Sequence, residues 1–192
     1  MDTSRRSDQG ADAVYHAIGK FFVAFSHLHS TAELLVVHLL ASEDPRRSWA
    51  AVSGSTTQPI VETFFSILYE VASDGWTKDD RVLVLSARRQ IDALISERNR
   101  IAHDIWSLGG HPNRPLPDGS DAERIRYGRS PKRGAVVTAT PVTVQELHEL
   151  FDTTERLRAV LRALSLAALR NPHPKPMDLL CLDDANLINV VT

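Results

Sequence analysis

The chain has 192 residues, a length typical of one domain with its own hydrophobic core. Apolar residues make up 43% of the chain and charged residues 24%, which excludes a disordered or fibrous protein. The formal net charge is −2, so a global positive field that attracts nucleic acid is excluded and any such attraction must be local.

The N-terminal residues 1–10 are polar, and we expect them to be disordered. They lack the apolar core of a signal peptide. From residue 11 to about residue 42, apolar side chains recur at helical spacing and predict a first helix. Its longest apolar run, residues 32–41, is interrupted by Glu33 and His38 and is too short to span a bilayer. We therefore expect a cytoplasmic protein without a membrane partner.

Two further helices follow. The sequence EDPRR at 43–47 is expected to end the first helix. The sequence SGSTTQP at 53–59 predicts a loop, and Pro59 suits the first turn of a second helix, whose apolar face extends to Ala72. Thr77 is the expected N-terminal cap of a third helix, which runs from about residue 79 to about residue 104.

Residues 107–141 are expected to form an insertion made of a loop and a basic β-hairpin. The loop is rich in glycine and proline, and the sequences RIRYG at 124–128 and AVVTAT at 135–140 are short β-type runs. No acidic residue occurs between positions 124 and 145, whereas five basic residues do: Arg124, Arg126, Arg129, Lys132 and Arg133. Such a hairpin suits binding to an RNA backbone, and a solvated loop explains the same charges equally well.

Thr143 and Glu146 form a capping-box pattern at the start of a fourth helix. The sequence NPHPKP at 171–176 ends that helix, and residues 172–192 are expected to pack as a C-terminal appendage. The predicted fold class is therefore all-α: a single domain over residues 1–192, with four helices and the β-hairpin insertion between the third and the fourth.

The third helix carries an arginine on its apolar face. At 100° per residue, Ile91 and Ile105 each lie about 20° from Arg98, and Ala102 lies about 40° away. The charge of Arg98 is permanent, and an unpaired buried charge costs several kcal/mol. Arg98 therefore either pairs with a buried acid, with Glu33 as the first candidate, or faces a polar cleft.

His103 follows Arg98 five positions later, and Asn99 shares a helix face with it. On an ideal helix Arg98 and His103 lie about 140° apart, so they converge only if the helix ends there or a second chain completes the site. The sequence RNRIAH at 98–103 resembles the Arg-x4–6-His signature of HEPN domains. These are four-helix proteins in which a polar residue such as asparagine follows the arginine, and the helical pattern from about 11 to 170 fits them.

The resemblance implies a metal-independent endoribonuclease of a toxin or defence system, in which a homodimer places two motifs face to face. Arg98 would stabilise charge on the scissile phosphate, and Asn99 would orient the histidine or the phosphate. His103 would act as general acid or base on the ribose 2′-hydroxyl or the leaving oxygen. Arg100 and the basic residues of the hairpin would bind RNA. No cofactor is implied, and the single cysteine, Cys181, excludes a cysteine-based zinc site.

An antitoxin protein is a further candidate partner. Some HEPN toxins are controlled by a nucleotidyltransferase antitoxin that modifies a tyrosine two residues after the histidine. Ile105 holds that position here and has no hydroxyl group to modify, so this form of control is not expected for the chain. Two other hypotheses stay open. The chain is either a non-catalytic HEPN-type binding or dimerisation module with Arg98 in a structural ion pair, or a small regulatory protein that binds a nucleotide or another protein in the same cleft.

Overall fold

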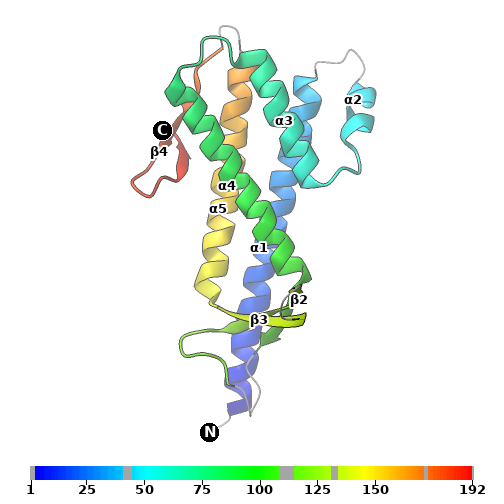
Figure 1. The fold of residues 1–192 in the computed structure, drawn as a ribbon, viewed down its shortest axis with the longest axis vertical. Coiled ribbons are helices and arrows are strands. Elements are labelled where there is room, and N and C mark those ends of the chain that lie inside the picture. The colour runs from blue at the N-terminus through cyan, green and yellow to red at the C-terminus, as the bar shows by residue number, and fades with distance from the viewer. Residues whose placement is uncertain (1–2, 41–44, 109–114, 131–133, 171–172, 192) are drawn as a thin grey trace. The chain divides into compact units, whose positions relative to one another are not determined.

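The computed structural model describes residues 3–40, 45–108, 115–130, 134–170 and 173–191. These residues are mostly helical, with a three-stranded antiparallel sheet after the fourth helix and a two-stranded hairpin near the C-terminus (Figure 1). The fold therefore mixes helices and strands and is not the all-α fold expected from the sequence. In chain order, the elements are α1 (Thr3–Leu39), α2 (Pro45–Val52), α3 (Thr57–Ala72), α4 (Lys78–His103), β1 (Ile105–Leu108), β2 (Ala122–Ser130), β3 (Gly134–Val142), α5 (Val144–Leu169), α6 (Pro176–Leu179), β4 (Leu180–Leu182) and β5 (Ile188–Val190).

The four predicted helices are present as α1, α3, α4 and α5. Residues 3–10, expected to be disordered, belong to α1, since extending an existing helix adds one backbone hydrogen bond per residue. The sequence EDPRR was expected only to end the first helix, but its proline begins α2. Proline lacks the N–H group that a helix interior needs, whereas the first turn of a helix leaves that group without an intrahelical acceptor.

Two predicted caps are confirmed by their hydrogen bonds. The Asp80 amide donates to Oγ1 of Thr77 at 3.2 Å, and the Thr77 amide donates back to Oδ2 of Asp80 at 2.8 Å. The Glu146 amide donates to Oγ1 of Thr143 at 3.1 Å, and the Thr143 amide donates to Oε2 of Glu146 at 2.7 Å. These reciprocal bonds satisfy backbone donors in the first turns of α4 and α5 and thereby set where both helices begin.

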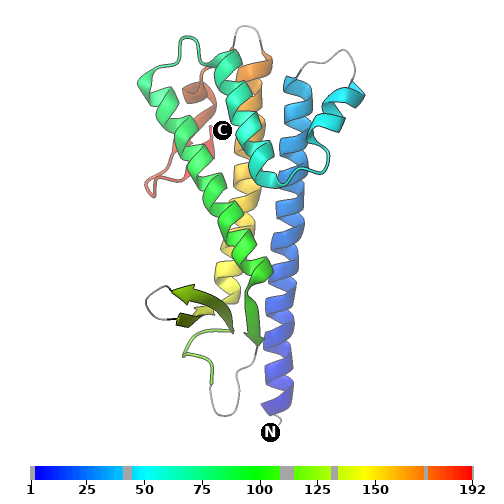
Figure 2. The same cartoon turned by 45° about the vertical axis from the view of Figure 1, so that its right-hand side comes forward.

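The predicted hairpin β2–β3 is confirmed, but it forms a sheet with a third strand, β1, that was not predicted from the sequence. The strand order is β1-β2-β3, with Ile105 opposite Ile125 and Trp106 opposite Arg124. Figure 2 shows β1 continuing directly from the end of α4. The Trp106 indole donates a hydrogen bond to the carbonyl oxygen of Ile101 at 3.0 Å, so a carbonyl left over at the helix end gains a donor as the chain turns into the strand.

The chain forms two compact units. The first comprises residues 1–24 and 96–152, and it contains the sheet, the end of α4 and the start of α5. Its core is made of buried apolar side chains from α1, the end of α4, the sheet and the start of α5: Val14, Ala17, Phe21, Ala24, Ile101, Ala122, Val142 and Leu147.

The second unit comprises residues 25–95 and 153–192. Parts of α1, α3, α4 and α5 run alongside one another in it (Figure 1 and Figure 2). Its largest fully buried side chains include Leu28, Ile60, Phe64, Phe65, Leu68, Ile91, Leu157, Leu161, Leu164 and Leu180. All of these residues except Leu180 of β4 lie in the four helices, where buried side chains recur at helical spacing, which is why pattern alone predicted those helices.

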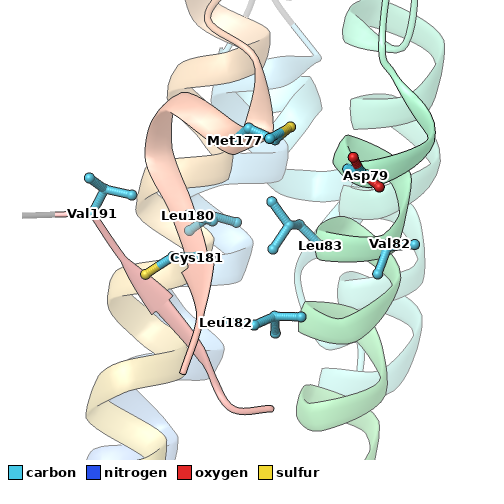
Figure 3. A pocket seen from close by; sticks show the side chains of 8 residues that line it. All are labelled: Asp79, Val82, Leu83, Met177, Leu180, Cys181, Leu182 and Val191. Atoms are coloured by element: carbon cyan, nitrogen blue, oxygen red, sulfur yellow. The ribbon is translucent and has the colours of Figure 1, made fainter. Parts of the chain in front are cut away.

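The C-terminal segment, α6 with β4 and β5, is held to α4 and α5 by polar contacts. The Met177 amide donates to Oδ1 of Asp80 at 3.0 Å, and Arg156 donates to the carbonyl oxygen of Ile188 at 2.8 Å. Gln90 donates to the carbonyl oxygen of Asn186 at 3.2 Å. Between this segment and α4 lies a mostly apolar pocket of about 420 Å³, into which Leu83 and Leu180 point from opposite sides (Figure 3).

Within the described residues, the stretch Gly10–Leu39 of α1 is long and apolar enough to cross a membrane by length and composition. A third of its most apolar window is buried inside the protein. Core helices of soluble proteins meet the same criterion, so cytoplasmic localisation stays a prediction.

Candidate functional site

The candidate motif lies in the last two turns of α4, which ends at His103. Arg98 is half-buried and keeps its place on the apolar face of the helix, where Ile91 and Ile101 are buried. In the last turn of α4 the buried position is Ile101, which is 3% exposed, whereas Ala102 is exposed. The prediction that Ala102 and Ile105 extend this face was therefore wrong, and for Ile105 the reason is that the helix has already given way to β1.

Arg98 is placed by an aromatic ring and a side-chain amide. Its guanidinium carbon lies 5.5 Å from the centre of the Phe22 ring, a cation–π distance, and Nη1 donates to Oδ1 of Asn99 at 3.2 Å. Glu33, the acid first considered as its partner, contacts His29 on its own helix, with 3.5 Å between Nε2 and Oε1. The contacts with Phe22 and Asn99, both in the first unit, thus fix the orientation of the Arg98 guanidinium near the end of α4.

His103 is the last residue of α4, and its side chain is exposed, as is that of Asn99. The prediction that His103 lies off the apolar face is confirmed. An exposed imidazole at a helix end is accessible to a substrate and carries little of the folding energy. The catalytic roles of Arg98, Asn99 and His103 stay predictions.

Two acidic residues that were not predicted from the sequence organise the same helix end. Asp104 follows α4 directly, and its Oδ1 accepts a hydrogen bond from Nε of Arg126 at 2.8 Å, while its Oδ2 lies 3.4 Å from Nε of Arg124. Glu97 pairs with Nη1 of Arg124 through one oxygen and with Nη1 of Arg100 at 3.1 Å through the other. The side chains of Asp104 and Arg124 are only 8% and 12% exposed, so this network ties β2 to α4 largely out of solvent.

The network changes the interpretation of the basic hairpin. Three of the residues expected to bind RNA, Arg100, Arg124 and Arg126, are engaged by carboxylates in the structure. Among the described residues of the insertion, Arg129 is exposed and forms no ion pair, and Lys132 and Arg133 lie outside the described residues. Glu97 lies seven positions, or about two helical turns, before Asp104, so the two acids lie on the same side of the chain at the end of α4, and this spacing is the signal that could have revealed them as partners for a basic strand.

Over the described ranges, no group of three histidine, cysteine, aspartate or glutamate side chains is placed to hold a metal ion. No protein-family model, curated protein or solved structure matches the chain. The resemblance to HEPN domains therefore depends on the motif at 98–103 and on its position at the end of α4.

Proposed function

We propose that the protein is a metal-independent endoribonuclease of the HEPN type, acting as a toxin or defence effector, and that α1, α3, α4 and α5 form a HEPN-like four-helix bundle. The observation that supports this best is the end of α4, where an oriented guanidinium, an exposed amide and an exposed imidazole occur within six residues. These are the groups that RNA cleavage without a metal requires, namely a fixed positive charge and a side chain that can donate or accept a proton.

In this mechanism the ribose 2′-hydroxyl loses its proton to a base and attacks the adjacent phosphorus. The bond to the 5′-oxygen breaks, that oxygen gains a proton, and the product carries a 2′,3′-cyclic phosphate. His103 would transfer one of these protons, and Arg98 would stabilise the charge that develops on the phosphoryl oxygens. Asn99, already bonded to Arg98, would hold the guanidinium or the phosphate in position.

One arginine and one histidine are few groups for this reaction. We therefore place the site at the interface of a homodimer, where two copies of the motif supply a base and an acid across a two-fold axis. RNA would be met in the cytoplasm, and an antitoxin protein is a candidate regulator.

The second candidate function is a non-catalytic HEPN-type binding or dimerisation module. It is favoured by the contact between Arg98 and Phe22 and by the engagement of Arg124 and Arg126 with carboxylates, since all three arginines then serve the fold. We prefer the nuclease because the module gives no role to the exposed His103.

The proposed nuclease is tested by incubating the purified protein with 5′-labelled RNA in the presence of EDTA and by mapping the ends of the products. We expect cyclic-phosphate ends with the wild-type protein and a loss of about 10²–10⁴-fold in rate for His103→Ala, the usual contribution of one general acid or base. His27→Ala, which removes another exposed histidine from α1, is the matched control and should cleave at the wild-type rate. Intact RNA with the wild-type protein, or equal rates for wild type and His103→Ala, would contradict the proposal.

A further inference from the structure

Strand β2 carries arginines on both of its faces, and the two faces have different surroundings. Successive side chains of a strand point to opposite sides of the sheet. Arg124 and Arg126 point to the side where Glu97 and Asp104 hold them. Ile125, Tyr127 and Arg129 consequently point to the other side, which we call the Tyr127 face.

The Tyr127 face is apolar and aromatic, and it is open to solvent. Tyr127 is 68% exposed and lies opposite Val137, which is 54% exposed. Ile105, on β1, is 56% exposed and lies opposite Ile125. Because directly opposed residues of antiparallel strands share a face, these side chains form one continuous exposed surface across three strands.

The solvent-exposed charge on this face of β2 is positive. Arg129 is exposed, and its cross-strand partner is Ala135. Glu123 is the acid of β2 on the same face, and it is only 8% exposed. Strand β3 contains no acidic residue. A polyanion with planar apolar groups complements such a surface. Its phosphates would contact Arg129, and its bases would stack on the Tyr127 ring, which is open to solvent.

We propose that the Tyr127 face binds single-stranded RNA, with one base stacked on Tyr127 and a neighbouring phosphate held by Arg129. An aromatic ring with an adjacent arginine is the pattern by which proteins bind single strands with little sequence preference. The choice of RNA as ligand rests on the proposed ribonuclease activity. In the first unit β1 begins two residues after His103, so an RNA strand bound on this sheet would lie along the chain segment that carries the motif.

The test is a binding titration with a fluorescently labelled 12-nucleotide RNA of a single base type, in EDTA and in the His103→Ala background so that cleavage does not interfere. Tyr127→Ala should raise the Kd by about 5- to 150-fold, the effect of losing one stacked base. Tyr127→Phe should bind like the parent, whereas Tyr127→Leu, which keeps apolar bulk without the ring, should resemble Tyr127→Ala. Tyr15→Ala removes a similarly exposed tyrosine, 64% accessible on α1, and should leave the Kd unchanged.

Arg129→Ala should weaken binding and reduce the slope of log K against log salt concentration by about 0.7, the value for one phosphate contact to a single strand. Arg162→Ala, which removes an exposed arginine from α5, is the charge-matched control. A duplex of the same length should show no dependence on Tyr127, because its bases are already stacked. Circular dichroism of each variant shows whether the fold is retained, and Tyr127→Phe against Tyr127→Leu separates the ring from the apolar volume.

The outcomes distinguish this inference from the proposed activity. Equal Kd values for Tyr127→Ala, Tyr127→Leu and the parent would overturn the inference, even if the wild-type protein cleaves RNA. A change in oligomeric state in place of a change in Kd would also overturn it, because the face would then be a protein interface. Loss of binding on Tyr127→Ala, with a wild-type protein that binds RNA but never cleaves it, would support the inference and contradict the nuclease.

Discussion

Arg126 on β2 donates a hydrogen bond from Nε to Oδ1 of Asp104 at 2.8 Å, although 22 positions separate the two residues. Asp104 follows the last residue of α4, where the helix dipole places partial negative charge, so an aspartate alone would be unfavourable there. Arg124 lies against the same carboxylate, 3.4 Å from Oδ2. The positive charges of the two arginines offset the negative charge of the Asp104 carboxylate and the partial negative charge of the helix end. They thereby hold in place the segment that carries the candidate motif.

Arg124 should contribute much more to stability than Arg126. Replacing Arg124 with alanine removes the most buried arginine of the network, 12% exposed, and leaves Asp104 and Glu97 only partners that are about half exposed, so we expect a loss of about 3 kcal/mol in the free energy of unfolding. Arg126 is 49% exposed, and Arg126→Ala should cost about 1 kcal/mol or less because Asp104 keeps Arg124. Urea unfolding measures both, with Arg100→Ala as the exposed control. Equal losses for Arg124 and Arg126 would show that the network is not buried in solution.

Arg98 is expected to be a modest contributor to stability. The structure places its guanidinium over Phe22, and a cation–π contact of this kind contributes about 0.5–2 kcal/mol. Loss of this contact should lower the unfolding free energy of Arg98→Ala by that amount, and the variant should also lose RNA cleavage; Phe22→Leu should remove the same contact while Arg98 keeps its hydrogen bond to Asn99. A loss of about 3–5 kcal/mol in urea melts of Arg98→Ala would instead identify Arg98 as a member of a buried ion pair.

Asp80 is expected to make the protein acid-sensitive. Burial raises the pKa of the Asp80 carboxyl, but hydrogen bonds from Thr77 and from the Met177 amide, together with the charge of Lys175, outweigh burial and hold the pKa below its ordinary value of 3.8. Because the folded pKa is depressed, the stabilisation is complete above about pH 4 and is lost as the pH falls below 3.8 toward the folded value.

The matched variant for Asp80 is Asp80→Asn, which keeps the size of the side chain. At pH 7 we expect it to lower the unfolding free energy by about 1–3 kcal/mol, the effect of losing hydrogen bonds to a charged acceptor. The difference from the wild type should shrink as the pH is lowered from 4 to 2, and the Met177 amide should exchange its hydrogen faster in the variant. A difference that is constant over this pH range would contradict the assigned role of the Asp80 charge.

The proposed dimer predicts that His103 of one chain lies near His103 of its partner. In a Cys181→Ser background, which removes the native thiol, His103→Cys should form a disulfide-linked dimer under mild oxidation. His27→Cys in the same background is the exposed control and should remain unlinked. Light scattering at micromolar concentration should give twice the chain mass. A strictly monomeric mass, without cross-linking at position 103, would remove the interface from the proposal.

Elements with periodic patterns could be predicted from the sequence, whereas elements and contacts that depend on distant partners could not. The apolar spacing predicted α1, α3, α4 and α5, and local cap chemistry located Thr77 and Thr143. Strand β1 is four residues long and follows α4 with one residue between them. It is therefore too short to show an alternation of apolar and polar residues distinct from the helical pattern before it. The pairing of Glu97 with Arg124 joins positions 27 apart, and it exists only because β2 folds back on the helix end.

Because successive side chains of β2 point to opposite sides of the sheet, even-numbered and odd-numbered residues of this strand lie on different faces. Arg124 and Arg126 are even-numbered and bind the acids of α4, whereas Tyr127 and Arg129 are odd-numbered and lie on the open face. Inserting or deleting one residue inside β2 would exchange the two faces for all residues beyond that point. An arginine that binds Glu97 or Asp104 would then point to the open face, or Tyr127 would point toward these acids. Two residues added or removed together would preserve the assignment. Homologous chains should therefore tolerate varied lengths in the loop before β2, while the spacing from Arg124 to Tyr127 changes only in steps of two.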